Sequence, residues 1–473
     1  MNKLLKLAVA SCAALLSLQS QAAGTSVKHP DWSRNAVIYE INTRQYTPEG
    51  TFDAFAEHLP RLRQLGADIL WFMPIHPISE VNRKGTLGSY YAVKDYTGVN
   101  PEFGNLESFK ATVDKAHQLG MKVIIDWVPN HTGCDNAWTV EHHDWFARDD
   151  KGQMYGPFDW SDVFQLDYNN PQMRQAMIDA MLFWVKEIGI DGFRCDVAGR
   201  VPVDFWDECR RQLEAAKGEG QLFMLAEATE PELLNNAFDM DYNWPMKDLQ
   251  NAIASTLGEY AYVRDGQDQP ERLPVKNASD IKLLLDEQAA QYPAGSYMMN
   301  MVTNHDLNSW EGTEYERYGN YLPAMTVLSY ILPGMPLIYT GQEVQLDRAL
   351  EFFEKDPVME FSALKQPGSR ASQWTAMLQN LNTFKHDYPQ LAAGIDNTEV
   401  AASANPSEHL VIIRKPVDGR TESVIGLMNL GKQPMDISSY TAKAKASAAY
   451  GRAGLMALPE SLAPGEAAII VCE

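Results

Sequence analysis

Short apolar runs alternate with longer segments of helical periodicity from residue 37 onward. In the helical segments, apolar residues recur three or four positions apart, and Gly120 and Gly189 stand where two of these segments should end. This alternation predicts repeated strand–helix units around a parallel sheet. The clearest strand-like runs are residues 37–41, 69–75, 123–128, 192–197, 223–226, 298–302 and 337–339.

A weaker apolar run at residues 238–244 completes a set of eight strands. The polar stretch 264–296 is expected to form an elaborated loop with a short helix. Because no glycine-rich phosphate-binding loop follows the first run, a closed (β/α)8 TIM barrel is favoured over an open doubly wound sheet. The predicted fold class is therefore α/β.

Two further segments depart from the barrel pattern. Residues 131–170 are rich in Asp, Gly, Trp and Tyr and lack periodicity, so they should form a short loop domain after the third strand. After residue 391 the pattern changes to short strand-like runs broken by Pro and Gly turns, which predicts a small C-terminal β-sandwich. The expected domains are a catalytic barrel over 24–390, with the loop domain at about 131–170, and a β-sandwich over 391–473.

The N-terminus has the features of a secretory signal peptide. Lys3 and Lys6 precede an apolar run that is shorter than a bilayer span and ends in small residues, which predicts cleavage after Ala22 or Ala23 and a leader of residues 1–23. Cys12 offers lipid anchoring as a lesser alternative, although the apolar run continues past it. We expect an exported protein, periplasmic or extracellular, with no transmembrane segment.

Charge and cysteine content restrict the partners. The 473-residue chain carries a formal net charge of −22, which argues against nucleic acid and anionic membranes, since these attract Lys and Arg. A neutral sugar as substrate is compatible with this negative net charge. With Cys12 in the leader, the four other cysteines are too scattered for a zinc site or a disulfide framework, so we expect buried free thiols. The oligomeric state stays open.

Polar residues end several of the predicted strands, which is where a barrel gathers its functional groups. Residues 126–131 are Asp-Trp-Val-Pro-Asn-His, residues 192–196 are Gly-Phe-Arg-Cys-Asp, Glu227 follows the fifth run, and residues 304–306 are Asn-His-Asp. Any one of these acids alone could be only a helix cap or an ion-pair partner. Their convergence on successive strands instead indicates an active site.

Arg194 and Asp196 should share one side of their strand, because successive side chains alternate, while Cys195 points to the other side. The guanidinium then favours the charged form of Asp196 and should lower its pKa, as a nucleophile requires. Glu227 suits the opposite role of proton donor. Because adjacent strands lie about 4.8 Å apart, the two carboxyls should be close enough for a retaining mechanism.

The four motifs resemble those of glycoside hydrolase family 13, the α-amylase family, over residues 37 to about 343. The resemblance implies hydrolysis of α-glucosidic bonds, mainly α-1,4, in starch-like glucans or maltooligosaccharides. It implies that Asp196 is the nucleophile, Glu227 the general acid/base and Asp306 the third carboxylate, which grips sugar hydroxyls. The residues implied to position the sugar or the nucleophile are Tyr91, His131, Arg194 and His305, and those implied to give structural support are Asp126 and Asp95.

The chain departs from the family at the acceptor and metal positions. Typical members continue the fourth-strand motif with Lys-His, whereas this chain has Gly199 and Arg200, so the acceptor contact and the calcium contact of that pair both lack their residues. Asn130 matches a family calcium ligand and Asp167 is a nearby oxygen donor, which leaves a structural calcium open. No cofactor is expected to be required.

Several functions remain as alternatives. Hydrolysis of internal or oligomeric α-1,4 bonds is the first hypothesis. The second is glucosyl transfer, cyclomaltodextrinase-like or neopullulanase-like action, or cleavage of α-1,6 bonds by a member of the same family. A non-catalytic glucan-binding barrel is the third, and the presence of all three acids argues against it. Four tryptophans could either extend a sugar-binding cleft or pack in the interior: Trp138, Trp145, Trp160 and Trp310.

Overall fold

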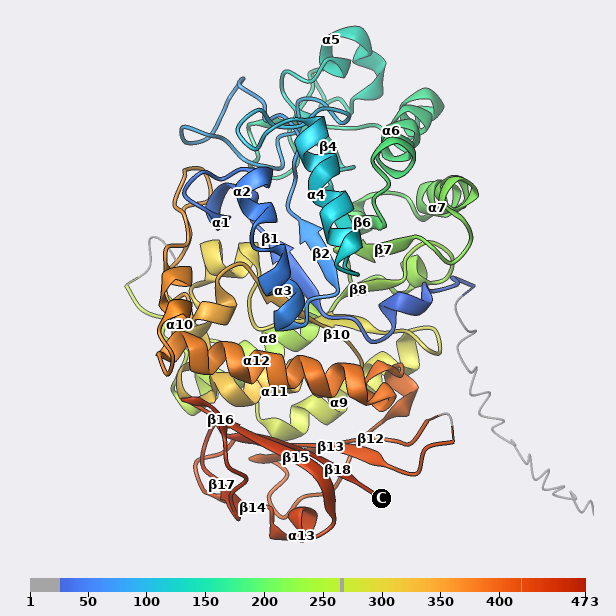
Figure 1. Cartoon of the computed structure of the whole chain (residues 1–473). Helices are drawn as coiled ribbons and strands as arrows, with labels where there is room; N and C mark the ends of the chain where they lie inside the picture. The colour runs from blue at the N-terminus through green and yellow to red at the C-terminus, as the bar shows by residue number, and fades with distance from the viewer. Residues whose placement is uncertain (1–25, 264–267, 418) are drawn as a thin grey trace, which may run out of the picture.

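A computed structural model describes residues 26–263, 268–417 and 419–473, so the predicted leader lies outside the described residues. Eight parallel strands close into a barrel in the order β1-β10-β9-β8-β7-β6-β3-β2, which confirms the predicted fold class (Figure 1). Each predicted apolar run overlaps one of them. The strands are β1 Ile38–Ile41, β2 Ile69–Phe72, β3 Lys122–Trp127, β6 Gly192–Cys195, β7 Phe223–Ala226, β8 Met240–Tyr242, β9 Met298–Asn300 and β10 Gly334–Tyr339.

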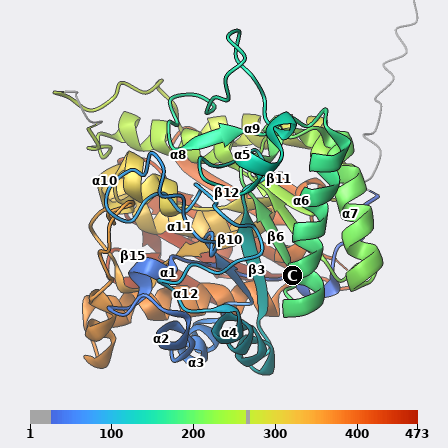
Figure 2. The ribbon, with the colours of Figure 1, turned by 90° about the horizontal axis from the view of Figure 1, so that it is seen from above.

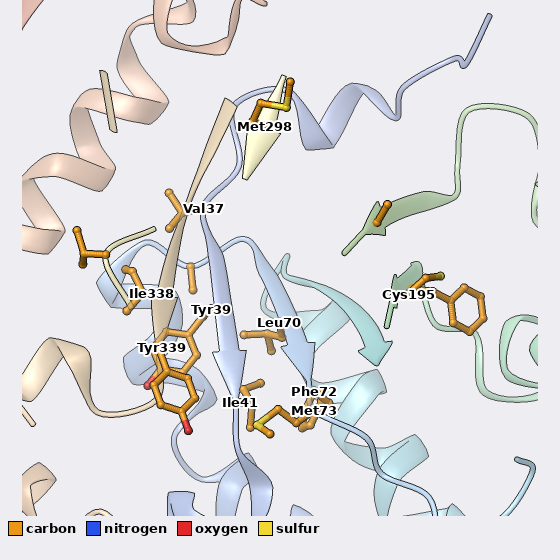
Figure 3. Close-up of a cluster of buried hydrophobic side chains, with 14 of the residues drawn as sticks. Val37, Tyr39, Ile41, Leu70, Phe72, Met73, Cys195, Met298, Ile338 and Tyr339 are labelled. Carbon is orange, nitrogen blue, oxygen red and sulfur yellow. The ribbon is translucent and has the colours of Figure 1, made fainter. Parts of the chain in front are cut away.

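Alternation along each strand divides the core into two layers. Val37, Tyr39 and Ile41 point outward and pack in the layer between the strands and the helices (Figure 3). Ile38, which lies between them, belongs instead to a second cluster inside the barrel, together with Trp71 and other inward residues of the remaining strands. Apolar side chains therefore fill the barrel, and the polar inward residues follow where the strands end.

Helices surround the strands, as the view from above shows (Figure 2). The polar stretch expected to hold a short helix contains α9, which is 14 residues long. The length of this helix was underestimated because its buried residues, which include Ile281 and Leu285, form only a narrow stripe. Asn277 caps it in a capping box. The main helices are α2 Phe52–Ala56, α3 Leu59–Leu65, α4 Leu106–Gln118, α6 Pro171–Phe183, α7 Val203–Lys217, α8 Trp244–Leu257, α9 Ala278–Gln291, α10 Glu314–Tyr318, α11 Leu322–Ile331 and α12 Arg370–Asp387.

The excursion after β3 forms a small unit at one end of the barrel. Strands β4, His131–Gly133, and β5, Val163–Gln165, pair antiparallel across it, and the short helix α5, Trp138–Glu141, lies between them in the chain. In Figure 1 this unit and the C-terminal sheet lie at opposite ends of the molecule. The excursion therefore covers the end of the barrel at which the parallel strands finish.

The C-terminal region is an antiparallel sheet that packs on the barrel helix α11 (Figure 1). Gly426 makes this contact close, because a Cβ there would lie 2.7 Å from Ile331. A two-stranded sheet completes the region, with Met435 and Leu462 in the shared core. The strands are β11 Thr398–Val400, β12 His409–Arg414, β13 Ser423–Asn429, β14 Met435–Asp436, β15 Ala444–Gly451, β16 Gly454–Met456, β17 Ser461–Leu462 and β18 Ala467–Cys472.

Two sequence expectations concern the chain as a whole. The four cysteines that the structure describes, Cys134, Cys195, Cys209 and Cys472, are buried free thiols, as predicted. Over the described ranges, no helix combines the length and the apolar character that crossing a bilayer requires.

Candidate active site

Arg194 is the centre of the polar cluster at the strand ends. It points inward from β6, is fully buried, and its Nη1 lies 2.8 Å from Asp126 and 3.0 Å from Asp196. Its Nη2 lies 2.9 Å from Oε2 of Glu227. Nε donates to the hydroxyl of Tyr242 at 3.0 Å. One guanidinium therefore holds three carboxyl groups from three neighbouring strands, β3, β6 and β7.

The pKa of Asp196 differs from the expectation based on Arg194 alone. Burial raises the pKa of Asp196 well above its ordinary value, Arg194 lowers it, and the nearby carboxylates of Glu227, Asp126 and Asp306 raise it further. The guanidinium acts in the predicted direction, but burial and crowding of acids outweigh it. The prediction of a lowered pKa is thus wrong for the unliganded site, because it counted the cation and left out the desolvation.

His305 forms a second cationic centre at the end of β9. Its Nδ1 is hydrogen-bonded to Glu40, and its Nε2 lies 2.7 Å from the hydroxyl of Tyr91 and 3.4 Å from Asp306. Burial lowers the pKa of His305, but the carboxylates of Asp306 and Glu40 outweigh it and raise the pKa to about 9. The side chain is therefore an imidazolium at neutral pH and presents a charged donor beside Asp306, whose carboxylate is 36% exposed.

His131 has the opposite character. It is almost completely buried, and burial lowers its pKa to about 4, so the ring is neutral at neutral pH. Its Nδ1 lies 3.2 Å from the side-chain amide of Asn130, and its ring packs against Trp160. The two histidines named from the sequence thus offer the site one neutral and one charged group.

Val197 follows Asp196 in a strained conformation. Its φ is +39°, in the left-handed region that a β-branched residue rarely adopts, at a cost on the order of 1–3 kcal/mol. In this conformation its N–H donates to Oε2 of Glu227 at 2.9 Å. The turn therefore fixes Glu227 against the segment that carries Asp196.

A cavity of about 520 Å³ opens above these groups, a volume typical of small-ligand sites. Tyr91 lies in its wall, with its ring nearly parallel to those of His305 and Phe352 and its hydroxyl donating to Asp126 at 3.1 Å. Asp126 itself lies beneath the cavity. The lining residues are Lys84, Ser89, Tyr91, His131, Asp159, Trp160, Asp162, Val163, Asp196, Val197, Glu227, His305, Asp306, Trp310, Phe352 and Phe353.

The four tryptophans divide between the two roles considered from the sequence. Trp160 and Trp310 line the cavity, and Trp310 is nearly half exposed. Trp138 and Trp145 pack against each other with ring centroids 5.1 Å apart and do not line it. Trp160 and Trp310 are therefore available to stack on a sugar.

The residues considered for calcium, Asn130 and Asp167, make hydrogen bonds within the protein. Asn130 Oδ1 accepts a hydrogen bond from Gln165 Nε2 at 2.9 Å, and Asp167 Oδ1 accepts two hydrogen bonds from Asn169. Among the described residues, no group of three or more His, Cys, Asp or Glu is arranged to hold a metal ion. The Oδ1 atoms of Asn130 and Asp167 are therefore already engaged in protein hydrogen bonds.

Gly199 and Arg200 stand at the surface beside the site. A Cβ at Gly199 would lie 2.5 Å from Oε2 of Glu230, so a larger residue there would require the Glu230 side chain to move. The Arg200 guanidinium instead lies 4.9 Å from the ring centroid of Phe158, at the surface. Neither residue lines the cavity.

Asp95 does not reach the site. It is exposed, and its Oδ1 accepts hydrogen bonds from the N–H and the hydroxyl of Thr97, so the support it gives is limited to a local turn. The sequence reasoning missed Glu40, Trp71 and Tyr242, which contact His305, Asp126 and Arg194. Glu40 had a usable signal, because it is the single acid within the first apolar run.

Comparison with known proteins agrees with this geometry. The family model for the α-amylase catalytic domain matches residues 20–165 and 140–401. A cyclomaltodextrinase from a Bacillus species is 25% identical over 414 residues, 75% of this chain and 68% of the relative. Neopullulanase 2 from Thermoactinomyces vulgaris is 27% identical over 68% of this chain, which spans 58% of that relative.

Two solved structures match nearly the whole chain. An α-amylase from Lactobacillus plantarum is 31% identical with a TM-score of 0.73, and the match covers 93% of this chain and 99% of that one. The maltogenic α-amylase AmyB from Thermotoga neapolitana is 26% identical with a TM-score of 0.72, over 93% of this chain and 96% of that one. A pair of carboxyls at the strand ends of a barrel is an arrangement that glycoside hydrolases use. The chain belongs to the α-amylase family, glycoside hydrolase family 13.

Proposed function

We propose that this protein is a retaining hydrolase of α-glucosidic bonds, mainly α-1,4, in starch-like glucans or maltooligosaccharides. The observation that carries the proposal is the joint attachment of Asp196 and Glu227 to one buried guanidinium, at 3.0 and 2.9 Å. Carboxyls held close together leave no room for a water between carboxylate and sugar, which favours direct attack by the carboxylate.

In the first step, the Glu227 carboxyl donates its proton to the glycosidic oxygen while an oxygen of Asp196 attacks C1. The bond between C1 and the leaving oxygen breaks, and a glucosyl ester of Asp196 forms. In the second step, Glu227 removes a proton from water, the water oxygen attacks C1, and the ester bond breaks. Each step inverts C1, so the product keeps the α-configuration.

The remaining groups hold the sugar in this scheme. Asp306 offers an acceptor to ring hydroxyls, and the imidazolium of His305, 3.4 Å away, places a positive charge beside it. Tyr91 lines the cavity beside the nucleophile and contributes apolar ring surface to the sugar-binding site. His131, neutral at pH 7, contributes an uncharged ring nitrogen.

We also propose that the protein acts outside the cytoplasm, in the periplasm or the medium. The support is the leader expected at residues 1–23, whose charged start, apolar run and small-residue end are those of a cleaved signal. An anchor at Cys12 is the alternative. A chain with a net charge of −22 and a site for neutral sugar is compatible with either location.

Substrate profiling tests the proposed function. The purified protein should release reducing sugar from maltotriose and longer maltooligosaccharides. Parallel incubations with starch, pullulan and cyclodextrin separate the family alternatives, since longer products indicate glucosyl transfer and preferential attack on pullulan indicates a different linkage. Binding of maltooligosaccharides without turnover on any of these substrates would contradict the proposal and favour a non-catalytic barrel.

Calcium is not expected to be required. Because Asn130 and Asp167 already have protein partners, activity and melting temperature at moderate temperature should be unchanged after dialysis against a chelator. Dialysis followed by addition of calcium provides the matched control. A large loss of activity or melting temperature in chelator, reversed by calcium, would show that the hydrogen bonds of Asn130 and Asp167 yield to a metal.

A further inference from the structure

Residues 82–87, which we name the strap, follow β2 and cross one side of the active-site cavity. At one end they are attached to the loop domain, because Lys84 Nζ lies 3.3 Å from Asp162 and the Asn82 side chain donates to the Ser161 carbonyl at 3.1 Å. Lys84 and Asp162 both line the cavity. The strap thus joins the barrel to the loop domain.

The other end of the strap is attached to the loop after β10. The Thr86 N–H donates to Glu354 Oε1 at 2.8 Å, the Thr86 hydroxyl donates to Oε2, and the Leu87 N–H donates to the Phe353 carbonyl at 3.1 Å. Gly85 permits this approach, because it has a φ of +60° and a Cβ there would lie 2.5 Å from the Cβ of Phe353. The strap and the β10 loop therefore form one continuous wall.

A buried arginine fixes the base of this wall. Arg44 donates to the carbonyls of Leu87, Gly88 and Phe352 at 3.1 to 3.3 Å, and so joins the strap to the β10 loop from below. It is 1% exposed. Charged hydrogen bonds from a buried guanidinium are strong and directional, so the wall is held in place rather than resting on surface contacts.

The position of the wall relative to the scissile bond follows from the barrel. Asp196 and Glu227 follow β6 and β7, and in the strand order β10 lies opposite β6 and β1 lies opposite β7. The sugar that reacts must have C1 between Asp196 and Glu227. C4 is at the opposite end of a pyranose ring. A ring that lies across the cavity from β6 and β7 therefore directs its C4 hydroxyl, where a longer chain would continue, toward Lys84 of the strap, Phe352 and Phe353.

We propose that the strap closes the donor end of the cavity, so that the enzyme takes α-glucan by its non-reducing end and releases a monosaccharide. This inference rests on the proposed function and adds the class of substrate: linear chains with a free non-reducing end. Lys84 and Asp162 meet the terminal hydroxyls, and a chain that continues past C4 would collide with the wall.

The test compares p-nitrophenyl α-maltoheptaoside with the same substrate blocked by a 4,6-ethylidene group at its non-reducing end. The wild-type protein should cleave the free substrate with a kcat/KM at least about 100-fold higher than that of the blocked one. Cyclodextrin, which has no chain end, should be equally resistant. Cleavage of the blocked and free substrates at similar rates would overturn the inference but leave the proposed hydrolase function standing. If neither substrate were cleaved, both the proposed function and the inference would be contradicted.

A double variant tests whether the strap itself is responsible. Lys84→Ala with Thr86→Ala removes one side-chain attachment at each end, and it should raise kcat/KM on the blocked substrate relative to the free one by about tenfold or more. Lys94→Ala is the matched control, since Lys94 also pairs with a loop-domain aspartate, Asp135 at 3.3 Å, but does not line the cavity. The control should leave the ratio unchanged. An unchanged ratio in the double variant would assign the exclusion to another part of the wall and overturn the role of the strap.

Discussion

Replacing Asp196 by Asn, or Glu227 by Gln, should lower kcat by roughly four orders of magnitude or more, because the covalent route needs both groups. Asn and Gln preserve the shape of the side chains, and Arg194 keeps its pair with Asp126 in either variant. The fold should therefore persist, which circular dichroism and the melting temperature can check. Steady-state kinetics on maltooligosaccharides give the measurement.

The two variants should differ on a substrate that needs no proton. α-Glucosyl fluoride has a leaving group that departs without general acid help, so Glu227→Gln should still form the glucosyl ester rapidly, while Asp196→Asn should not. If either variant, folded and free of contaminating enzyme, turned over maltooligosaccharides within about tenfold of the wild-type rate, the replaced residue would be excluded from the mechanism.

Arg194→Met should have the second largest effect. It removes the only guanidinium within reach of Asp126, Asp196 and Glu227 among the described residues, and leaves buried carboxyls without their partner. Breaking a buried ion pair on one side costs about 3–5 kcal/mol of the free energy of unfolding. Activity should fall by at least about 100-fold as well, because the nucleophile and the acid lose their common anchor. Denaturant unfolding and kinetics on the folded fraction measure the two effects.

Arg210 offers the matched control for this variant. It is also buried and pairs with a buried carboxylate, Asp239 at 2.6 Å, but it lies outside the cavity. Arg210→Met should therefore lose comparable stability and keep its turnover per folded molecule. If Arg194→Met instead retained turnover within about tenfold of wild type, the assignment of Arg194 to the positioning of the catalytic carboxyls would be wrong.

The sequence predicted the features that depend on alternation and on strand ends. Barrel strands are short, apolar and regularly spaced, so the runs identified their positions, and alternation placed Arg194 and Asp196 on the same inward side. The same rule would have placed Glu40 inside the barrel. That acid was passed over because it belongs to no motif, although Asp306 and Glu40 together raise the pKa of His305 and keep it charged.

Loop conformation and desolvation could not be predicted in the same way. The strap depends on the meeting of Lys84 with Asp162 and of Thr86 with Glu354, pairs separated by 78 and 268 positions in the chain, and no local pattern encodes such a contact. The direction of the Asp196 pKa shift depends on how many acids share one cation in a buried site. Asp95 lies outside the site although it is close to Tyr91 in sequence, because proximity in the chain does not determine where a loop side chain points.

Proton NMR of the first minutes of maltooligosaccharide cleavage tests the central claim most directly, because it reports the stereochemistry of attack at C1. If Asp196 forms a covalent glucosyl ester that water then hydrolyses, two inversions occur and the α-anomer should appear first, with the β-anomer following only through mutarotation. The Asp196→Asn variant under the same conditions should release neither anomer at a measurable rate. Initial release of the β-anomer by the wild-type protein would mean that water attacks C1 directly, and would contradict the assignment of Asp196 as nucleophile.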